Sequence, residues 1–312
     1  MEIDVIIPLY KPGKELFTLL DKLGSQSVPV HQVILLNTEE KYFEQLIYGI
    51  RFLETYQNVK VYHVSKREFD HGGTRRMGVK KSSADVFVMM TQDAMPKDDR
   101  LIEKLVEPLQ GEVAVAYARQ LPREDSTPVE SYTREFNYPA KSRIKSAAAL
   151  DSLGIKTFFC SNVCAAYRRE IYEELGGFVR HTIFNEDMIY AAKAVEAGYA
   201  IAYAADARVI HSHNYTNVQQ FQRNFDLGVS QAEHPEVFAA YPSESEGKRM
   251  VKDVTVYLRS NHMSAGLPHF YMQCACKYAG YLLGKNYRRL PKKWVLAFTS
   301  NKEYWKQNRK DV

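Results

Sequence analysis

The sequence has no run of 18 apolar residues among its 312, so no helix is expected to span a bilayer. Its four cysteines form no CxxC pair and have no histidines at metal-ligand spacing around them, which predicts reduced thiols. The first residues, Met1 to Asp4, lack the basic-then-apolar pattern of a secretory signal peptide. Together these absences predict a cytoplasmic protein.

Two glycine-rich nucleotide fingerprints are also missing. The first predicted strand–helix turn, Pro8 to Gly13, has no GxGxxG pattern, which disfavours a dinucleotide-dependent oxidoreductase. No Gly-Lys-Ser/Thr occurs, so the chain has no Walker loop. The main body also carries no recognisable nucleic-acid-reading module, so we expect no nucleic-acid partner.

Positive charge is concentrated at the C-terminal end. The net charge is +5, yet residues 271–312 hold ten lysines and arginines against two acidic residues, a local charge of +8. Aromatic residues interleave with these cations. We interpret this region either as a solvated helical face packed on the body or as a basic amphipathic helix on an anionic membrane surface.

Apolar runs alternate with segments of helical spacing along most of the chain. Strands are predicted over 3–10, 32–37, 59–64, 86–91, 113–117, 157–167, 199–203 and 207–213. Helices are predicted over 13–23, from the second strand to about 56, from the 70–78 stretch to about 83, over 168–175, over 186–197 and from 218 to the end. This alternation predicts an α/β fold with a doubly wound, mostly parallel sheet and flanking helices.

Two connecting segments are expected to serve a site. The glycine-bearing stretch 70–78 is predicted as a loop whose N–H groups meet a phosphate or ribose, with a tight turn as the alternative. The polar stretch 122–156 is predicted as a mobile excursion over the site. We expect a main domain over 1–225 and a helical, basic region over 226–312.

The apolar run Val86–Met90 ends abruptly at Thr91-Gln92-Asp93. Ligands of open α/β sheets bind beyond the carboxyl ends of the strands. Asp93 is therefore a candidate ligand for a metal ion or a phosphate-bound metal. A turn or capping role is the alternative.

Acidic and imidazole side chains mark two further candidate positions. Glu186 and Asp187 open a predicted helix, where the helix dipole favours carboxylates without any function. The functional alternative is a carboxylate that takes a proton from a sugar hydroxyl. His211 and His213 stand at a strand end, and we expect them to face opposite sides, one binding a divalent metal and the other packing.

Taken together, these segments resemble family-2 glycosyltransferases, the inverting GT-A type enzymes, over about residues 3–225. The matching segments, in order, are Val5–Tyr10, Gly72-Gly73-Thr74-Arg75, Thr91–Pro96, Leu175–Phe178, Asn185-Glu186-Asp187 and His211-Ser212-His213. Phe69–Arg75 and His211–Tyr215 look more specifically like bacterial rhamnosyltransferases, which use dTDP-L-rhamnose.

The resemblance implies a single displacement with inversion. Asp187 would be the general base, with Glu186 raising its pKa by like-charge repulsion. Mg²⁺ or Mn²⁺ would be held by Asp93 and one histidine, His213 in preference to His211. Contacts to the nucleotide sugar are expected from Pro8, Tyr10, Asn37, Glu39, Gly72, Gly73, Thr74, Arg75, Gln92 and Asp93.

Two motifs depart from the family pattern. Thr91-Gln92-Asp93 carries one of the two aspartates of the usual DxD motif, and Asn37-Thr38-Glu39 replaces an Asp-rich turn. A UDP-sugar donor is therefore one alternative, and a non-catalytic nucleotide-sugar-binding scaffold at the membrane surface is another. The expected acceptor is a growing cell-surface polysaccharide or a lipid-linked glycan, and residues 271–312 are expected to contact the inner face of the cell membrane.

Overall fold

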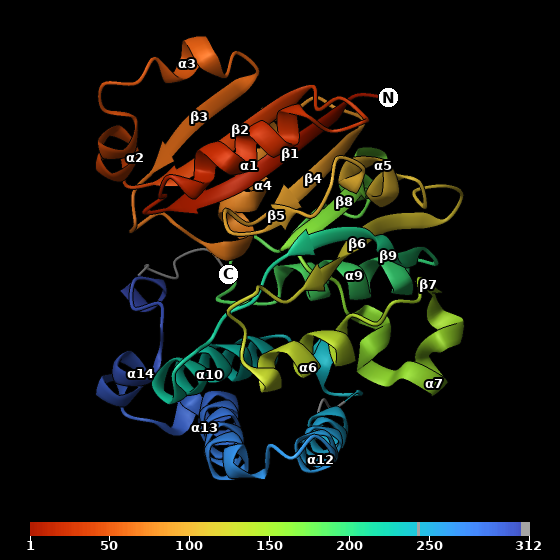
Figure 1. Ribbon diagram of the computed structural model, residues 1–312, viewed down its shortest axis with the longest axis vertical. Coiled ribbons are helices and arrows are strands. Elements are labelled where there is room, and N and C mark those ends of the chain that lie inside the picture. The colour runs from red at the N-terminus through yellow and green to blue at the C-terminus, as the bar shows by residue number, and fades with distance from the viewer. Residues whose placement is uncertain (242–243, 307–312) are drawn as a thin grey trace.

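The computed structural model describes residues 1–241 and 244–306, which build one mixed sheet covered by helices and a separate layer of C-terminal helices (Figure 1). The strands are β1 (Ile3–Tyr10), β2 (Gln32–Thr38), β3 (Val59–Val64), β4 (Val86–Met90), β5 (Met95–Pro96), β6 (Val113–Leu121), β7 (Arg143–Lys145), β8 (Cys164–Arg168) and β9 (Ala200–Ile210). Their order in the sheet is β3-β2-β1-β4-β8-β6-β9-β5, with β7 paired to β9.

Strand direction places the carboxyl ends of the main strands at one edge. β3, β2, β1 and β4 are mutually parallel, and β8 runs antiparallel to both β4 and β6. β6 and β9, which pair in parallel, therefore run in the same direction as the first four strands. The predicted mostly parallel sheet is confirmed.

Helices cover both faces of this sheet. The α-helices are α1 (Glu15–Gly24), α2 (Glu40–Ile47), α3 (Phe52–Thr55), α4 (His71–Lys81), α5 (Leu101–Val106), α6 (Pro128–Asn137), α7 (Leu150–Leu153), α8 (Arg169–Glu174), α9 (Glu186–Glu196), α10 (Asn217–Glu233), α11 (Pro235–Phe238), α12 (Glu244–Ser260), α13 (Leu267–Lys285) and α14 (Lys292–Phe298). Short 3₁₀ helices are η1 (Ala147–Ala149), η2 (Gly154–Phe158), η3 (Ser264–Gly266), η4 (Tyr287–Arg289) and η5 (Tyr304–Lys306).

Alternation along β1 divides the core into two layers. Ile3, Val5 and Ile7 lie in a cluster with the buried leucines of α1 and α5. Ile6 faces the other way and lies in a cluster with Val79 of α4 and the inward residues of α9. Because successive side chains of a strand point to opposite faces, a fully apolar strand of this kind needs helices on both sides.

The predicted loop over 70–78 is wrong, because α4 already begins at His71. Asp70 is the N-cap, and its Oδ1 accepts the N–H groups of Gly72 (2.9 Å) and Gly73 (2.8 Å). A Cβ added at Gly72 would lie 2.0 Å from the Val179 carbonyl oxygen. Here the glycine permits close packing against the 179–182 segment instead of forming a phosphate-binding loop.

The same Asp70 carboxylate connects α4 to the segment that leads into α9. Its Oδ2 accepts the N–H of Thr182 at 3.2 Å and lies 2.8 Å from His181 Nδ1. About one turn further along α4, Arg75 Nε lies 3.2 Å from Oε1 of Glu186, the first residue of α9. The two helices are therefore connected near both of their N-terminal ends.

Several other segments differ from the predicted pattern. The stretch 122–156 contains α6, β7 and α7, and α6 is capped by the Thr127 side chain. The helix predicted to reach about 56 is divided into α2 and α3, and the strand predicted over 157–167 begins only at Cys164, after η2. The strands predicted over 199–203 and 207–213 form the single strand β9. Short apolar runs do not distinguish a strand from a buried helical turn by periodicity alone, which explains why the predicted strand included part of η2.

The predicted helical C-terminal region is confirmed, and it packs on the body through α10. A Cβ at Gly280 or Gly284 of α13 would lie within about 2.2 Å of the Phe221 or Phe225 carbonyl oxygen of α10. Only glycine permits this close approach of the two helices. The division after residue 225 stays a prediction, and its boundary falls within α10. Within the described residues, no helix combines the length and apolarity needed to cross a bilayer.

Candidate active site

A cavity of about 620 Å³ opens at the carboxyl edge of the sheet. Side chains from the ends of β1, β4, β6 and β9 contribute to it, together with the start of α9 and the segment before β8. Nine of the predicted site residues line it: Pro8, Tyr10, Arg75, Gln92, Asp93, Glu186, Asp187, His211 and His213. The strand-end rule points to Asp93, whereas Pro8, Tyr10, Arg75 and Gln92 are implied by the family resemblance.

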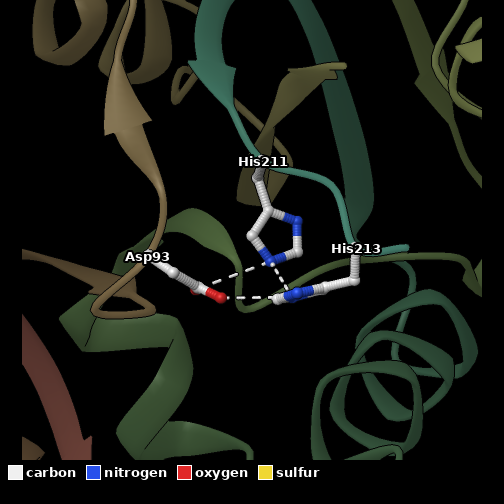
Figure 2. Close-up of side chains that lie close together, drawn as sticks. All are labelled: Asp93, His211 and His213. Atoms are coloured by element: carbon white, nitrogen blue, oxygen red, sulfur yellow. Dashed lines mark hydrogen bonds and ion pairs between the residues drawn. The ribbon is translucent and has the colours of Figure 1, made fainter. Parts of the chain in front are cut away.

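Asp93, His211 and His213 converge in this cavity (Figure 2). The pairing of Met95 in β5 with Ile210 in β9 brings the loop carrying Asp93 beside the end of β9. His213 Nε2 lies 3.1 Å from Asp93 Oδ2, and His211 Nε2 lies 3.5 Å from Asp93 Oδ1. The two Nε2 atoms are 3.1 Å apart.

The expectation that the two histidines face opposite sides is wrong. Residues two positions apart in extended backbone share a side, and both imidazoles point toward Asp93 (Figure 2). Hence no single histidine is singled out as the partner of Asp93.

The charge state of Asp93 suits a ligand. Partial burial opposes its charged form, but the neighbouring imidazoles of His211 and His213 outweigh this effect and hold the pKa of the carboxyl well below its usual range. Burial lowers the pKa of His211, so its neutral form is favoured. An ionised carboxylate beside a neutral imidazole is a typical donor set for a divalent cation.

These donors fit a divalent metal geometrically as well. One oxygen of Asp93 and one nitrogen from each histidine lie within 4.8 Å of one another. Mixed oxygen and imidazole donors suit ions such as Mn²⁺. Among the described residues, no other group of three or more such side chains comes together in this way.

A second acidic pair lies across the cavity at the start of α9. Glu186 is buried, and its Oε1 accepts the Asn162 side-chain amide at 3.0 Å in addition to the ion pair with Arg75. Asp187 accepts the backbone N–H of Asn162 at 2.9 Å and that of Met188 at 2.8 Å. Asn162 therefore contacts both acids.

The environment separates the two carboxyl groups in acidity. Burial, followed by the negative charge of Glu186, raises the pKa of Asp187 to about 7. Burial opposes ionisation of Glu186 too, but Arg75 and His71 outweigh it, and the pKa of Glu186 is lowered. Glu186 thus stays charged while Asp187 can exchange a proton near neutral pH.

Tyr10 and Gln92 join the ends of β1 and β4. The Tyr10 N–H donates to Gln92 Oε1 at 2.9 Å, and Gln92 Nε2 donates to the Tyr10 carbonyl at 3.2 Å. Through this pair, Gln92 holds the two strand ends together beside Asp93.

Five predicted contact residues lie outside the cavity lining: Asn37, Glu39, Gly72, Gly73 and Thr74. Asn37 is buried, and its amide donates to the Glu39 carbonyl at 3.1 Å. Glu39 has a φ of 68°, and its carboxylate accepts the N–H of Lys66. The side chains of Asn37 and Glu39 therefore stabilise the end of β2 instead of lining the cavity.

Several lining residues had no recognisable sequence signal. Asn162 stands in an ordinary Ser-Asn-Val segment, and Gln120 and Arg134 lie far from every quoted motif. Their positions depend on strand pairing and helix packing over long sequence separations. Only the tertiary structure could reveal them.

Comparisons with known proteins give consistent results. The family model described as "Glycosyl transferase family 2" matches residues 4–176. The chain is 39% identical over 311 residues to the O-antigen chain rhamnosyltransferase RfbN of Salmonella typhimurium, covering 98% of this chain and 96% of that protein. It is 41% identical over 254 residues to the O-antigen chain rhamnosyltransferase WbaN of Salmonella anatum, covering 80% of each.

Solved structures share the fold at low sequence identity. A mannosyltransferase from Pyrobaculum calidifontis, in complex with GDP-Man and Mn²⁺, aligns with a TM-score of 0.56 and 16% identity, over 97% of this chain and 84% of that one. Residues 1–349 of S. aureus TarS, in complex with UDP-GlcNAc, align with a TM-score of 0.53 and 13% identity, over 93% and 92%.

Proposed function

The chain belongs to glycosyl transferase family 2, and we propose that it transfers L-rhamnose from dTDP-L-rhamnose, with inversion, to a sugar hydroxyl of a lipid-linked or growing cell-surface polysaccharide. The observation that carries the proposal is that one cavity holds a three-ligand cluster at Asp93 and a carboxyl group of raised pKa at Asp187. The rhamnosyltransferase relatives support the sugar, and their names support an O-antigen-type acceptor.

Asp187 is the proposed general base. Two backbone N–H groups hold its carboxylate in place, from Asn162 and from Met188. As the acceptor oxygen attacks the anomeric carbon, the carboxylate takes the hydroxyl proton and the bond from that carbon to the diphosphate breaks. A pKa of about 7 makes the group a stronger base than an ordinary aspartate and still leaves a large ionised fraction at neutral pH.

Asp93, His211 and His213 are the proposed metal ligands, for Mg²⁺ or Mn²⁺. When bound, such an ion neutralises negative charge that builds up on the leaving diphosphate. We propose donor contacts from residues that line the cavity, namely Pro8, Tyr10, Arg75 and Gln92.

Calorimetric titration with dTDP, dTDP-rhamnose, UDP and UDP-glucose, each with Mn²⁺ and with EDTA, tests the donor. We expect tight, metal-dependent binding of the dTDP pair. A preference for UDP would discard rhamnose and retain the family. Binding of a nucleotide sugar with no transfer to any acceptor would favour the non-catalytic scaffold, and failure of every nucleotide to bind would overturn the donor proposal. Transfer to a lipid-linked acceptor, followed by determination of the anomeric configuration, tests inversion.

We also propose that the outer face of α13 rests on an anionic membrane surface. Tyr271, Met272, Tyr278 and Leu282 are exposed on this helix at helical spacing, and Tyr278 is 56% exposed. The aromatic residues Tyr281 and Tyr287 are buried and do not contribute. Residues 307–312 of the basic tail lie outside the described residues.

Flotation with phosphatidylglycerol vesicles tests this surface. Deleting residues 271–312 would remove the glycine contacts with α10, so we prefer the triple variant Tyr271→Ser/Tyr278→Ser/Leu282→Ser. We expect the wild type to float with anionic vesicles and the variant to stay in the soluble fraction. Tyr48→Ser/Leu53→Ser/Ile144→Ser, which alters three apolar residues elsewhere that are more exposed, is the control. A wild-type chain that does not float would overturn the membrane proposal.

A further inference from the structure

Gln120, near the end of β6, forms hydrogen bonds with four side chains although it is only 3% exposed. Its Nε2 donates to the Tyr138 hydroxyl at 2.6 Å and to Ser161 Oγ at 3.0 Å. Its Oε1 accepts from Arg134 Nη1 and faces His211 Nδ1 at 3.0 Å. The proposed mechanism assigns no role to Gln120 or to Arg134.

Arg134 fixes which way the Gln120 amide points. A guanidinium group only donates hydrogen bonds, so the amide atom facing it must be the oxygen. Arg134 is itself held by an ion pair, with its Nε 2.7 Å from Glu130 Oε1. The amide therefore cannot flip without placing its NH₂ group against a cation.

The orientation of the amide determines the tautomer of His211. Since Gln120 Oε1 only accepts, His211 Nδ1 must carry the proton in this hydrogen bond. In the neutral imidazole, Nε2 then has a free lone pair, and Nε2 is the atom that faces Asp93 and His213.

We propose that Gln120, held by Arg134, is a positioning residue that keeps His211 in its Nδ1–H tautomer and so presents Nε2 as a metal ligand. This inference rests on the proposed metal site, and it assigns a role to two residues that do not touch the metal. Hydrogen-bond partners of metal-binding histidines typically account for about 10–100-fold in metal affinity.

Titration of the full chain with Mn²⁺ alone, followed by calorimetry, tests the proposal. Gln120→Met removes the acceptor at similar size, and we expect the Mn²⁺ affinity to fall by about 10–100-fold. Gln120→Glu retains oxygen acceptors for Arg134 and His211, and the hydroxyls of Tyr138 and Ser161 can donate to it. We expect its affinity to stay within about threefold of the wild type.

Gln26→Met provides a matched control. Gln26 is also a buried glutamine, and its amide bonds Lys22, Asp98 and Ile102 at a site away from the cavity. We expect this variant to lose thermal stability as Gln120→Met does and to bind Mn²⁺ as the wild type does. Arg134→Met, which frees the amide to flip, should weaken Mn²⁺ binding less than Gln120→Met.

The outcomes separate this inference from the proposed function. If Gln120→Met binds Mn²⁺ as tightly as the wild type, or if Gln120→Glu loses as much affinity as Gln120→Met, the positioning role is overturned while the metal site stands. If the wild type itself binds no Mn²⁺, the metal site fails and the positioning role fails with it.

Discussion

Two aspartates in one cavity differ in almost every physical respect. Asp93 lies in a loop after a strand beside two imidazoles, which hold its pKa well below its usual range. Asp187 lies in the first turn of a helix beside another carboxylate, and burial with that charge raises its pKa to about 7. The same side chain thus becomes a ligand in one environment and a proton acceptor in the other, because the neighbours stabilise opposite charge states.

The comparison is tested most severely by Asp187→Asn. An amide cannot take the acceptor proton, so we expect transfer to fall by about 10²–10⁴-fold. Donor binding with Mn²⁺ should persist, because Asp93 and the histidines are untouched. The measurements are kcat by product formation and donor affinity by calorimetry, and retained turnover would remove Asp187 from the base role.

Asp93→Asn should show the opposite pattern. Loss of the anionic ligand should weaken Mn²⁺-dependent donor binding by at least the ~10–100-fold that outer partners of a metal site contribute. Donor binding in EDTA should not change. Unchanged donor affinity with Mn²⁺ would show that Asp93 is not the metal ligand that this comparison requires.

Glu186→Gln sharpens the comparison by removing the charge that distinguishes Asp187. Without that charge, and with Arg75 left beside it, the pKa of Asp187 should fall from about 7. The base is active when ionised, so the acidic limb of the kcat/KM profile should move to lower pH, on the order of one unit. A limb that does not move would mean that Glu186 does not set this pKa.

The smallest expected effect is on stability. Because the folded pKa of Asp187 is raised, its contribution to stability is fully present below its unfolded pKa of about 3.9 and is lost as pH rises through about 7. Asparagine does not titrate, so the Tm of Asp187→Asn relative to wild type should increase between pH 4 and pH 8, by several degrees. Thermal unfolding followed by circular dichroism measures this difference, and a constant difference would contradict the raised pKa.

Sequence reasoning predicted the parts of the site that depend on local pattern. Val86–Met90 reads as a buried strand, so Asp93 could be placed at the carboxyl edge, and the apolar spacing of 186–197 placed Glu186 and Asp187 at a helix start. The Gly72-Gly73 pair led to the wrong prediction of a loop over 70–78, because glycine pairs are common in loops. The helix cap at Asp70 and the close contact of Gly72 with Val179 are visible only in the tertiary structure.

The remaining contacts depend on residues far apart in sequence. Gln120 and His211 are 91 positions apart, and Asn162 and Asp187 are 25 apart. Neither pair carries a spacing or composition signal that one sequence could show. The fold class and the main catalytic candidates were therefore predictable, whereas the partners that set their charge and tautomer were not.

The double connection between α4 and α9 has a consequence for the timing of catalysis. Asp70 joins their starts through Thr182 and His181, and one turn later Arg75 joins them again through Glu186. Two bodies joined at two points can rotate only about the line through both. The backbone N–H groups of Asn162 and Met188 also hold the Asp187 carboxylate, so its orientation is established when the chain folds. The conformational entropy of the Asp187 carboxylate is then lost once, during folding. It does not have to be lost again at each turnover.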